Sequence, residues 1–457
     1  MATSTPTRRA ATFAALEDPT YRILWLGGLV SFLAVQMEFI SRGWLAYELT
    51  GSNGGLGAVF LGFGIPMLLL TPWGGVVADR LPKRTVLIAC QLALGLSSAG
   101  IALAVAFDVI EYWMLIAGAV LQGAGFSFLG PARMAFTGAL VGQDRLANAI
   151  VLQQMSLNGT RIFGPSVAGA LIGIAFVGVG GVYFLTTALM LVAVTFTLRL
   201  PPGLPDADRP VRSPFQELGD GVSYVWSRPL LRLLVLTSFV VVMAAFPYVA
   251  FLPTIADEVF GVGSSGFGFM SGMSAVGALA ATVLIASRAD GPGAWRVQGI
   301  AGAVFAVGVA LLGVSPSFAV ALIVLVVVGA ASAAFQSVNN ALVLSNSDRA
   351  YHGRVQSLMM LSFSGFGIAA LPIGLLADAV GITTTLAGMG AVAFVAIAAY
   401  WVARNRILAA DPDAHGAHQP GEGLGEIVDH DDDLVTAAPA GATGVPSPAD
   451  LAPSRGR

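Results

Sequence analysis

Cysteine, lysine and charge in general are scarce in this chain. Its 457 residues include one cysteine, Cys90, which excludes an internal disulfide framework and any metal site built from cysteines. Charged residues make up 11% of the chain, whereas an ordinary soluble domain has roughly 25%. Lys83 is the only lysine among 23 basic residues. With 56% hydrophobic residues and so little charge, the composition is that of a polytopic membrane protein.

The sequence also lacks the marks of an enzyme. It has no nucleotide-binding loop, no nucleophile–base pair and no metal-ligating constellation. The stretches between its apolar runs are too short to fold a catalytic domain. We therefore expect no catalytic residue, no metal, no cofactor and no nucleic-acid partner.

Long apolar runs are abundant instead. A run of about 20 apolar residues is long enough to cross the hydrocarbon core as a helix. Twelve such runs predict an all-α membrane protein with twelve transmembrane helices, near residues 22–46, 55–77, 85–107, 112–132, 147–175, 181–200, 230–254, 265–287, 296–314, 317–344, 355–378 and 382–403.

The loops between these runs alternate in charge, which predicts an orientation. One set of loops holds basic residues: Arg8, Arg9, Arg80, Lys83, Arg84, Arg133, Arg145, Arg199, Arg209, Arg212, Arg228, Arg288, Arg296, Arg349, Arg354, Arg404 and Arg406. The other set holds acids without Lys or Arg: Glu48, Asp108, Glu111, Asp257, Glu258 and Asp378. Because basic loops stay in the cytoplasm, we expect both termini there, in the bacterial inner (plasma) membrane.

The two halves of the chain share traces of a repeat. Three pairs recur at nearly the same offset: Asp79 with Asp290, Asp144 with Asp348, and Pro165 with Pro372. They predict two pseudo-repeated six-helix bundles, an architecture typical of transporters. We expect bundles at 1–200 and 230–406, a cytoplasmic linker at 201–229 with a short amphipathic helix after residue 214, and a disordered tail at 407–457, which is too polar to fold a core.

The stretch after the second span, "GGVVADRLPKR", is the most specific motif. It resembles the signature loop of the major facilitator superfamily, Gly-x-x-x-Asp-Arg-x-x-Arg-Arg, and with the twelve spans it implies that fold. In that superfamily the aspartate and arginine of the loop form a cytoplasmic latch between the halves. The resemblance implies that role for Gly75, Asp79, Arg80 and Arg84.

Shorter stretches resemble one branch of this superfamily in particular. "GWLAYELTGS", "GPARMAF", "LANAI", "RIFGP" and "HGRVQSL" are similar to the enterobactin-exporter and macrolide-efflux branch, also called the transmembrane secretion effector group. The resemblance covers about residues 17–406. One departure concerns coupling: Ala119 stands where many drug–proton antiporters carry an arginine in the fourth span.

Three charges lie deep in the predicted spans. A charge at mid-membrane costs on the order of 3 kcal/mol on insertion scales. Glu38 lies about 24 Å along the first span at 1.5 Å per residue, and Arg42 follows one turn later on the same face. Arg161 lies near the middle of the fifth span. In one hypothesis Glu38 exchanges protons from the central cavity. In the other, Glu38 pairs with Arg42 or Arg161 and fixes helix packing.

Arg161 and the polar residues of the spans also have two interpretations. Arg161 either takes part in coupling or bonds carbonyls freed where Pro165 interrupts the span. The amide side chains either join helices or line the cavity. Our candidates for substrate contact are Gln36, Asn158, Asn339 and Asn340.

The expected function is secondary active transport. The resemblance implies a monomeric, proton-coupled efflux antiporter that moves lipophilic small molecules, either drugs (multidrug efflux) or a siderophore-like metabolite (siderophore export), across the bilayer by alternating access. Two alternatives stay open: a proton-independent facilitator or importer, and a non-transporting membrane sensor or assembly partner.

Overall fold

Helices make up the regular secondary structure of the described part of the chain. The structure, a computed structural model, describes residues 14–174, 176–204, 214–285, 293–348 and 351–410. The predicted tail beyond residue 410 and the middle of the predicted linker, residues 205–213, lie outside the described residues. Residues up to Ile407 belong to one compact unit, and the following paragraphs concern that unit.

Six long helices come first, after a short 3₁₀ turn, η1 (Ala14–Glu17). They are α2 (Pro19–Thr50), α3 (Asn53–Arg80), α4 (Lys83–Ala106), α5 (Tyr112–Leu140), α6 (Gln143–Ile172) and α7 (Gly178–Leu198). Side-chain caps start α2 and α3: Asp18 accepts hydrogen bonds from the N–H groups of Thr20 and Tyr21, and Ser52 accepts one from Gly55. Gly51 ends α2 in the left-handed conformation, with a φ of 58°. Pro165 lies inside a continuous α6.

The second part begins with the amphipathic helix α8 (Pro214–Ser227), as predicted. The long helices that follow are α9 (Pro229–Ala244), α11 (Gly263–Ile285), α12 (Ala294–Gly313), α13 (Phe318–Ser345), α14 (His352–Val380) and α15 (Ile382–Ala410). The predicted seventh span, 230–254, is not one regular helix. After α9 it continues through η2 (Phe246–Val249), α10 (Leu252–Thr254) and the π turn η3 (Ile255–Val259). Pro247 and Pro253 lie in this irregular stretch, where their missing N–H groups prevent a regular ladder.

The number of long helices agrees with the predicted twelve spans. Within the described ranges, ten helical segments are long and apolar enough to cross a membrane, with Pro229–Val259 taken as one segment. The other two long helices there are α6, with 30 residues, and α11, with 23 residues. Polar side chains such as Gln153 and Arg161 make α6 less apolar than its neighbours.

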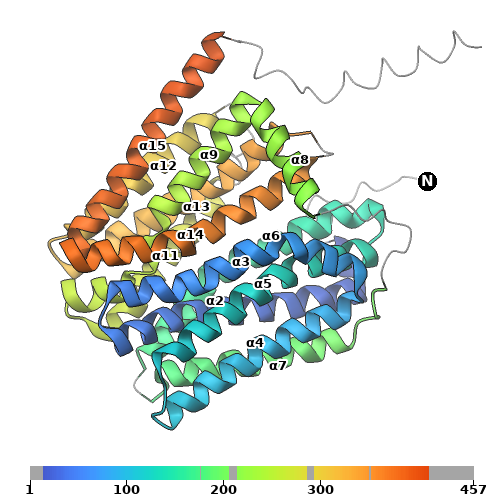
Figure 1. Ribbon diagram of the computed structural model, residues 1–457, viewed down its shortest axis with the longest axis horizontal. Coiled ribbons are helices and arrows are strands. Elements are labelled where there is room, and N and C mark those ends of the chain that lie inside the picture. The colour runs from blue at the N-terminus through green and yellow to red at the C-terminus, as the bar shows by residue number, and fades with distance from the viewer. Residues whose placement is uncertain (1–13, 175, 205–213, 286–292, 349–350, 411–457) are drawn as a thin grey trace, which may run out of the picture. The chain divides into compact units, whose positions relative to one another are not determined.

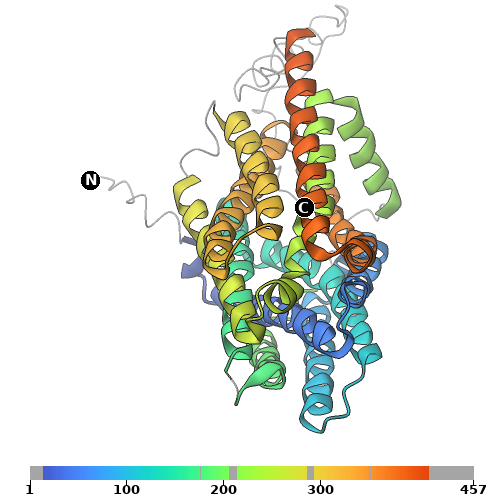
Figure 2. The same ribbon diagram turned by 90° about the vertical axis from the view of Figure 1, so that its left-hand side faces the viewer.

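The long helices form two packed groups. In the first group α2 packs on α6 and α7, α3 on α5, and α4 on α5 and α7; in the second, α13 packs on α11 and α12, and α9 on α14. Figures 1 and 2 both place α4 and α7 on one side of the unit and α12 and α15 on the opposite side. The groups meet along two seams, α3 with α14 and α6 with α11.

Glycines bring the backbones together at both seams. A Cβ atom at Gly64 of α3 would lie 2.9 Å from the Ser364 carbonyl oxygen and 3.0 Å from the Gly367 Cα of α14. A Cβ atom at Gly169 of α6 would lie 2.7 Å from the Gly268 Cα of α11. Helix pairs in a membrane associate through this kind of close packing of small residues.

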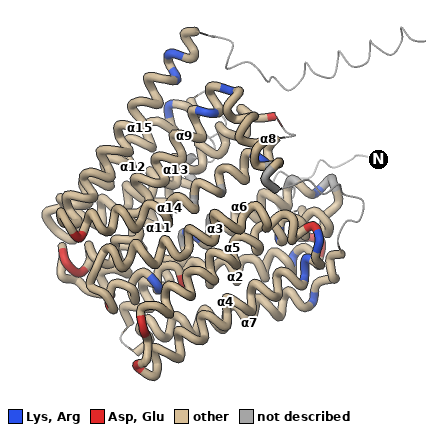
Figure 3. Tube along the Cα trace, viewed as in Figure 1, with Lys and Arg blue, Asp and Glu red and all other residues tan. Residues whose placement is uncertain are grey.

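Charge separates the two ends of the helices, as Figure 3 shows. At the end that we call the acidic end, Glu48 lies in the last turn of α2, Asp257 lies in η3 and Asp378 lies in the last turn of α14. At the opposite, basic end, α3 finishes with Arg80 and α4 begins with Lys83. The side of the membrane that each end faces stays a prediction.

The linker between the groups is attached to both of them. On the first group, Lys83 Nζ donates to the Leu204 carbonyl over 2.8 Å, and Arg84 donates to the Leu200 carbonyl over 3.0 Å. On the second group, the Tyr224 ring of α8 stacks on Tyr351 at a centroid distance of 3.9 Å. The linker therefore connects the α3–α4 turn to the segment before α14.

Candidate functional site

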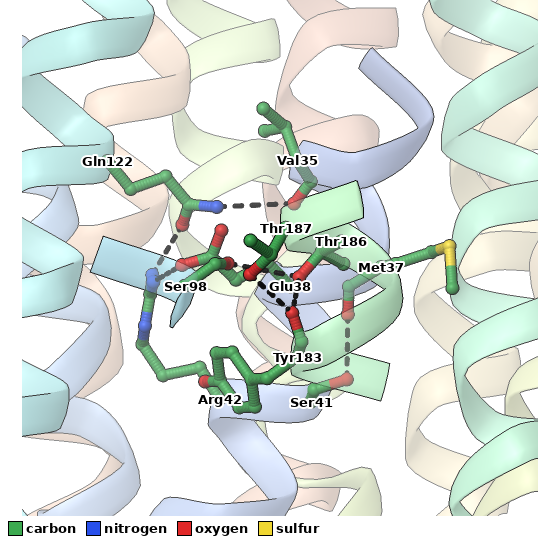
Figure 4. A network of polar contacts seen from close by, with 10 residues as sticks. All are labelled: Val35, Met37, Glu38, Ser41, Arg42, Ser98, Gln122, Tyr183, Thr186 and Thr187. Atoms are coloured by element: carbon green, nitrogen blue, oxygen red, sulfur yellow. Dashed lines mark hydrogen bonds and ion pairs between the residues drawn. The ribbon is translucent and has the colours of Figure 1, made fainter. Parts of the chain in front are cut away.

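Two of the three charges predicted deep in the spans form an ion pair on α2. Arg42 donates to Oε1 of Glu38, one turn earlier. Only 1% of Glu38 and 2% of Arg42 are exposed. The i, i+4 spacing places both side chains on one face of α2, and that face points into the first group of helices, toward α4, α5 and α7 (Figure 4).

Gln122 of α5 extends this pair. It accepts a hydrogen bond from Arg42 over 2.5 Å, and its amide donates to the Val35 carbonyl of α2 over 3.2 Å. The Arg42 guanidinium also lies against Gly118, where a Cβ atom would be 3.4 Å from Nη2. An arginine from α2 thus occupies the neighbourhood of Ala119, the position at which many antiporters carry an arginine on the fourth span.

Hydroxyl groups from two further helices surround the Glu38 carboxylate. Ser98 of α4 and Thr186 of α7 are hydrogen-bonded to each other over 3.0 Å, and the Tyr183 ring of α7 lies beside them (Figure 4). Within the described part of the chain, Oε2 of Glu38 and the Tyr183 hydroxyl are buried without a hydrogen-bond partner. One carboxylate oxygen is therefore held by Arg42, while the other has a lone pair that can accept a proton.

Gln36 of α2 and Arg161 of α6 are two further candidates from the sequence. Gln36 is half-buried and faces α6, where a Cβ atom at Gly164 would lie 2.5 Å from the Gln36 Cβ. Arg161 is on α6, which packs against α2 and α11. The structure thus pairs Glu38 with Arg42 and places Gln36 at the α2–α6 contact.

The amide candidates of the spans lie apart from one another. Asn339 of α13 is 1% exposed and accepts a hydrogen bond from Gln298 of α12 over 3.0 Å, so it joins two helices of the second group. Asn340 is half-buried. The side chain of Asn158 is outside what the structure describes.

The residues of the predicted latch lie at the basic end. Gly75, Asp79 and Arg80 lie near the end of α3, and Arg84 holds the Leu200 carbonyl as described above. Our candidate set left out Lys83, although this lysine is 5% exposed and holds the start of the linker. The sequence signal that could have singled it out is that Lys83 is the only lysine of the chain.

Arg133 corrects one sequence prediction. We assigned it to a loop because the predicted fourth span ended at 132, but α5 continues to Leu140 and Arg133 is 2% exposed. It donates to Ser31 over 2.9 Å and its guanidinium lies 4.6 Å from the Phe32 ring centroid. Gly28 makes room for it, because a Cβ atom there would lie 2.9 Å from Cζ of Arg133.

A pocket of about 460 Å³ opens along the α6–α11 seam. Its lining is mostly apolar and includes Phe163, Gly169, Phe269, Gly272, Val276 and Leu279. Phe269 and Phe163 are 62% and 52% exposed. An apolar pocket of this size on helices that cross a membrane can take a lipophilic molecule.

Comparison with known proteins places these features in a family. The sequence profile described as transmembrane secretion effector matches residues 10–437. The chain belongs to the transmembrane secretion effector family. It is a transporter of the major facilitator superfamily, and it is not an enzyme.

Two relatives of this transporter carry siderophore names. The chain is 24% identical over 360 residues to the staphyloferrin A transporter of Staphylococcus aureus (strain NCTC 8325 / PS 47), covering 77% of this chain and 88% of the relative. It is 25% identical over 379 residues to the enterobactin exporter EntS of Shigella flexneri, covering 78% and 84%.

Solved structures show the same fold at lower identity. The nucleoside transporter NupG superposes with a TM-score of 0.67 at 17% identity, over 84% of this chain and 99% of that chain. A bacterial homologue of the human lysosomal transporter Spinster, in an inward-facing and unoccupied conformation, gives a TM-score of 0.67 at 15% identity, over 89% and 98%.

Proposed function

We propose that this transporter is a monomer that exports lipophilic, siderophore-like small molecules from the cytoplasm in exchange for protons. The observation that carries the coupling part is the buried Glu38–Arg42–Gln122 network. The names of the staphyloferrin A and enterobactin relatives support the substrate class.

The network has the chemistry that proton exchange needs. Two charges in a membrane helix are costly to insert, and a pair can be replaced by apolar residues at little cost in stability. In the described structure, one oxygen of the Glu38 carboxylate is held by Arg42 and the other has no partner. The carboxylate can therefore be neutral or ionised without a rearrangement of the site. Proton binding would loosen the ion pair and alter how α2 packs on α4, α5 and α7.

The remaining features fit export of an apolar molecule. The α6–α11 pocket offers an apolar surface at membrane depth, and the deep arginines Arg42, Arg133 and Arg161 outnumber Glu38, the one deep acid of our assignment. Such a balance suits neutral, zwitterionic or anionic substrates better than cations. Gln36, Asn158 and Asn340 stay candidates for polar contacts with the substrate.

Alternating access would use the two helix groups. We place the basic end in the cytoplasm of a bacterial cell, because arginine-rich loops stay inside. The bundles 1–200 and 230–406 would rock about the central site, joined by the linker 201–229. The Asp79 loop would latch the basic end in one state, with Gly75, Arg80 and Arg84.

Proton release tests the coupling directly. Inside-out vesicles are prepared from cells that express wild type, Glu38→Gln or the control Glu48→Gln, and external pH is recorded as lipophilic dyes, macrolides and catechol-type siderophores are added. We expect substrate-triggered proton release with wild type and Glu48→Gln and none with Glu38→Gln. Release by Glu38→Gln at the wild-type rate would remove Glu38 from coupling. No release by wild type with any compound would overturn proton-coupled export of this panel and favour import or facilitation.

A further inference from the structure

A carboxylate from the second helix group caps a helix of the first group at the acidic end. Asp378, near the end of α14, accepts hydrogen bonds from three groups at the start of α3. Its Oδ1 accepts from the Asn53 N–H over 2.8 Å. Its Oδ2 accepts from the Gly54 N–H over 2.8 Å and from the Ser52 hydroxyl over 2.7 Å.

Asp378 is exposed, and its contact combines hydrogen bonds with the attraction of a charge to a helix end. The first N–H groups of a helix have no partner within the helix, and they carry the positive end of the helix dipole. An ionised carboxylate at that place gains both the dipole attraction and charge-assisted hydrogen bonds. The acidic loops hold no Lys or Arg, so the start of α3 takes the place of a cation for Asp378.

The packing around Asp378 is built for this contact. A Cβ atom at Gly54 would lie 2.9 Å from Oδ2 of Asp378, so a side chain there would displace the carboxylate. Gly374, one turn before Asp378, lies against the Asn53 backbone. The Asn53 side chain in turn accepts a hydrogen bond from Thr254 of the second group over 2.7 Å.

The position of Asp378 mirrors that of Asp79 on the same helix pair. The two helices run antiparallel; Asp79 lies near the end of α3 at the basic end, where α14 begins. The close approaches of the two backbones run from Gly374 beside Asn53, next to Asp378, to Gly367 beside Gly64, and Figure 1 shows α14 and α3 as neighbours.

We propose that Asp378 is the latch that closes the acidic end, and that this end opens when its carboxylate leaves the start of α3. Asp378 is then a positioning residue for the transport cycle. The inference rests on the alternating access proposed above and adds the residue that holds the described state. Under this proposal, the three hydrogen bonds of Asp378 break and form again in each transport cycle.

Distances between spin labels test the latch in the full-length protein. In a Cys90→Ser background, labels at Leu49 and Val380 report on the acidic end, and labels at Leu81 and Ser357 report on the basic end. Double electron–electron resonance is recorded without substrate for wild type, Asp378→Asn and the control Asp108→Asn. The control removes an exposed acid of the same end, and asparagine tolerates the positive φ of residue 108.

We expect Asp378→Asn to lengthen the Leu49–Val380 distances and to shorten the Leu81–Ser357 distances. The ratio of open to closed acidic ends should rise about twofold to fivefold, as expected for the loss of a charge at an exposed helix N-terminus. Asp108→Asn should match wild type. A distribution for Asp378→Asn equal to that of Asp108→Asn overturns the proposal, and so does a change at the acidic end alone, since a local packing defect would give it.

Ser52→Ala is a milder variant that keeps the test decisive if Asp378→Asn does not yield folded protein. It removes one of the three hydrogen bonds of Asp378 together with the cap on the Gly55 N–H, and it keeps the two backbone bonds of Asp378, so it should shift both distances in the same direction by a smaller amount. An unchanged distribution for this variant would then overturn the latch. Neither readout needs a substrate or a proton gradient, so failure of the latch and failure of the export proposal give separate results.

Discussion

At the scale of single residues, the ion pair on α2 carries most of the functional argument. Glu38 and Arg42 are each almost fully buried, and each is the other's partner. Removing one partner of such a pair leaves an uncompensated charge, whereas replacing both by apolar residues of similar size is often tolerated. Comparing a single variant with the double variant therefore distinguishes a stabilising role of the pair from a role in proton coupling.

We predict that Glu38→Gln lowers stability by about 3–5 kcal/mol, because Arg42 stays buried without its counter-charge. The double variant Glu38→Gln/Arg42→Met should recover most of that loss. Thermal unfolding midpoints in detergent measure both, with Glu48→Gln on the same helix as a neutral control. Recovery of stability without recovery of proton release would assign the pair to coupling. Equal midpoints for single and double variants would show that the residues are not mutual partners.

A second residue-scale prediction concerns Arg133. Gly28→Ala places a Cβ atom 2.9 Å from Cζ of this buried guanidinium, and overpacking of this kind costs about 1–3 kcal/mol. The matched control is Gly100→Ala on α4, where a Cβ atom meets nothing within 4 Å. We expect a lower unfolding midpoint for the first variant only. If both variants unfold at the same temperature, Arg133 can move aside and Gly28 is not required for it.

At the scale of elements, α8 packs mainly on α9 and α14 of the second group, and it also touches α3 of the first group. The Tyr224 hydroxyl accepts a hydrogen bond from the Asp348 N–H over 2.7 Å, and Arg228 donates to the Asp348 carboxylate over 2.6 Å. Together with the stacking of Tyr224 on Tyr351, these contacts fix α8 to the segment that leads into α14. A rocking motion of the second group would therefore carry α8 with it.

We predict that Tyr224→Ala detaches α8 from this segment. Backbone amides at 214–228 should exchange at least about tenfold faster in hydrogen–deuterium exchange, because stacking and one hydrogen bond are lost together. Tyr224→Phe keeps the stacking and should give a smaller increase. Val222→Ala, at an exposed position of the same helix, is the control. Unchanged exchange in Tyr224→Ala would mean that other contacts hold α8.

At the scale of the whole molecule, the described state has both seams in contact near the acidic end. Asn53 and Gly57 of α3 meet the later turns of α14, and Gly64 meets its middle. Gly169 and Gly173 of α6 meet Gly268 and Ser265 at the start of α11. Transport by alternating access requires these contacts to separate in another state.

We predict that a link across the acidic end stops transport. Ser52→Cys/Val380→Cys in a Cys90→Ser background can be joined by a short bifunctional thiol reagent that is cleaved by reductant. Transport should fall to background on cross-linking and return on reduction, while Leu49→Cys/Ser52→Cys, within one helix group, should stay active. Full activity of the linked Ser52–Val380 protein would contradict opening at this end.

Much of the fold could be predicted from local sequence, and the limits have physical causes. The length of an apolar run predicts helices such as α4 and α13, because a helix that crosses the hydrocarbon core of a membrane needs a run of that length. The same criterion ended the fourth span at 132, since it treats Arg133 as a loop residue, although Ser31, Phe32 and Gly28 accommodate its guanidinium inside the protein. It also predicted one regular helix at 230–254, where Pro247 and Pro253 break the ladder.

The sequence by itself determined the membrane class, the long helices, the alternating charge of the loops and the spacing that pairs Glu38 with Arg42, because these follow from hydrophobic length and helical periodicity. Tertiary structure alone decided that this pair faces α4, α5 and α7, that Gln122 completes it and that Asp378 reaches the start of α3. These contacts join residues up to 326 positions apart, and only the packing of whole helices brings them together.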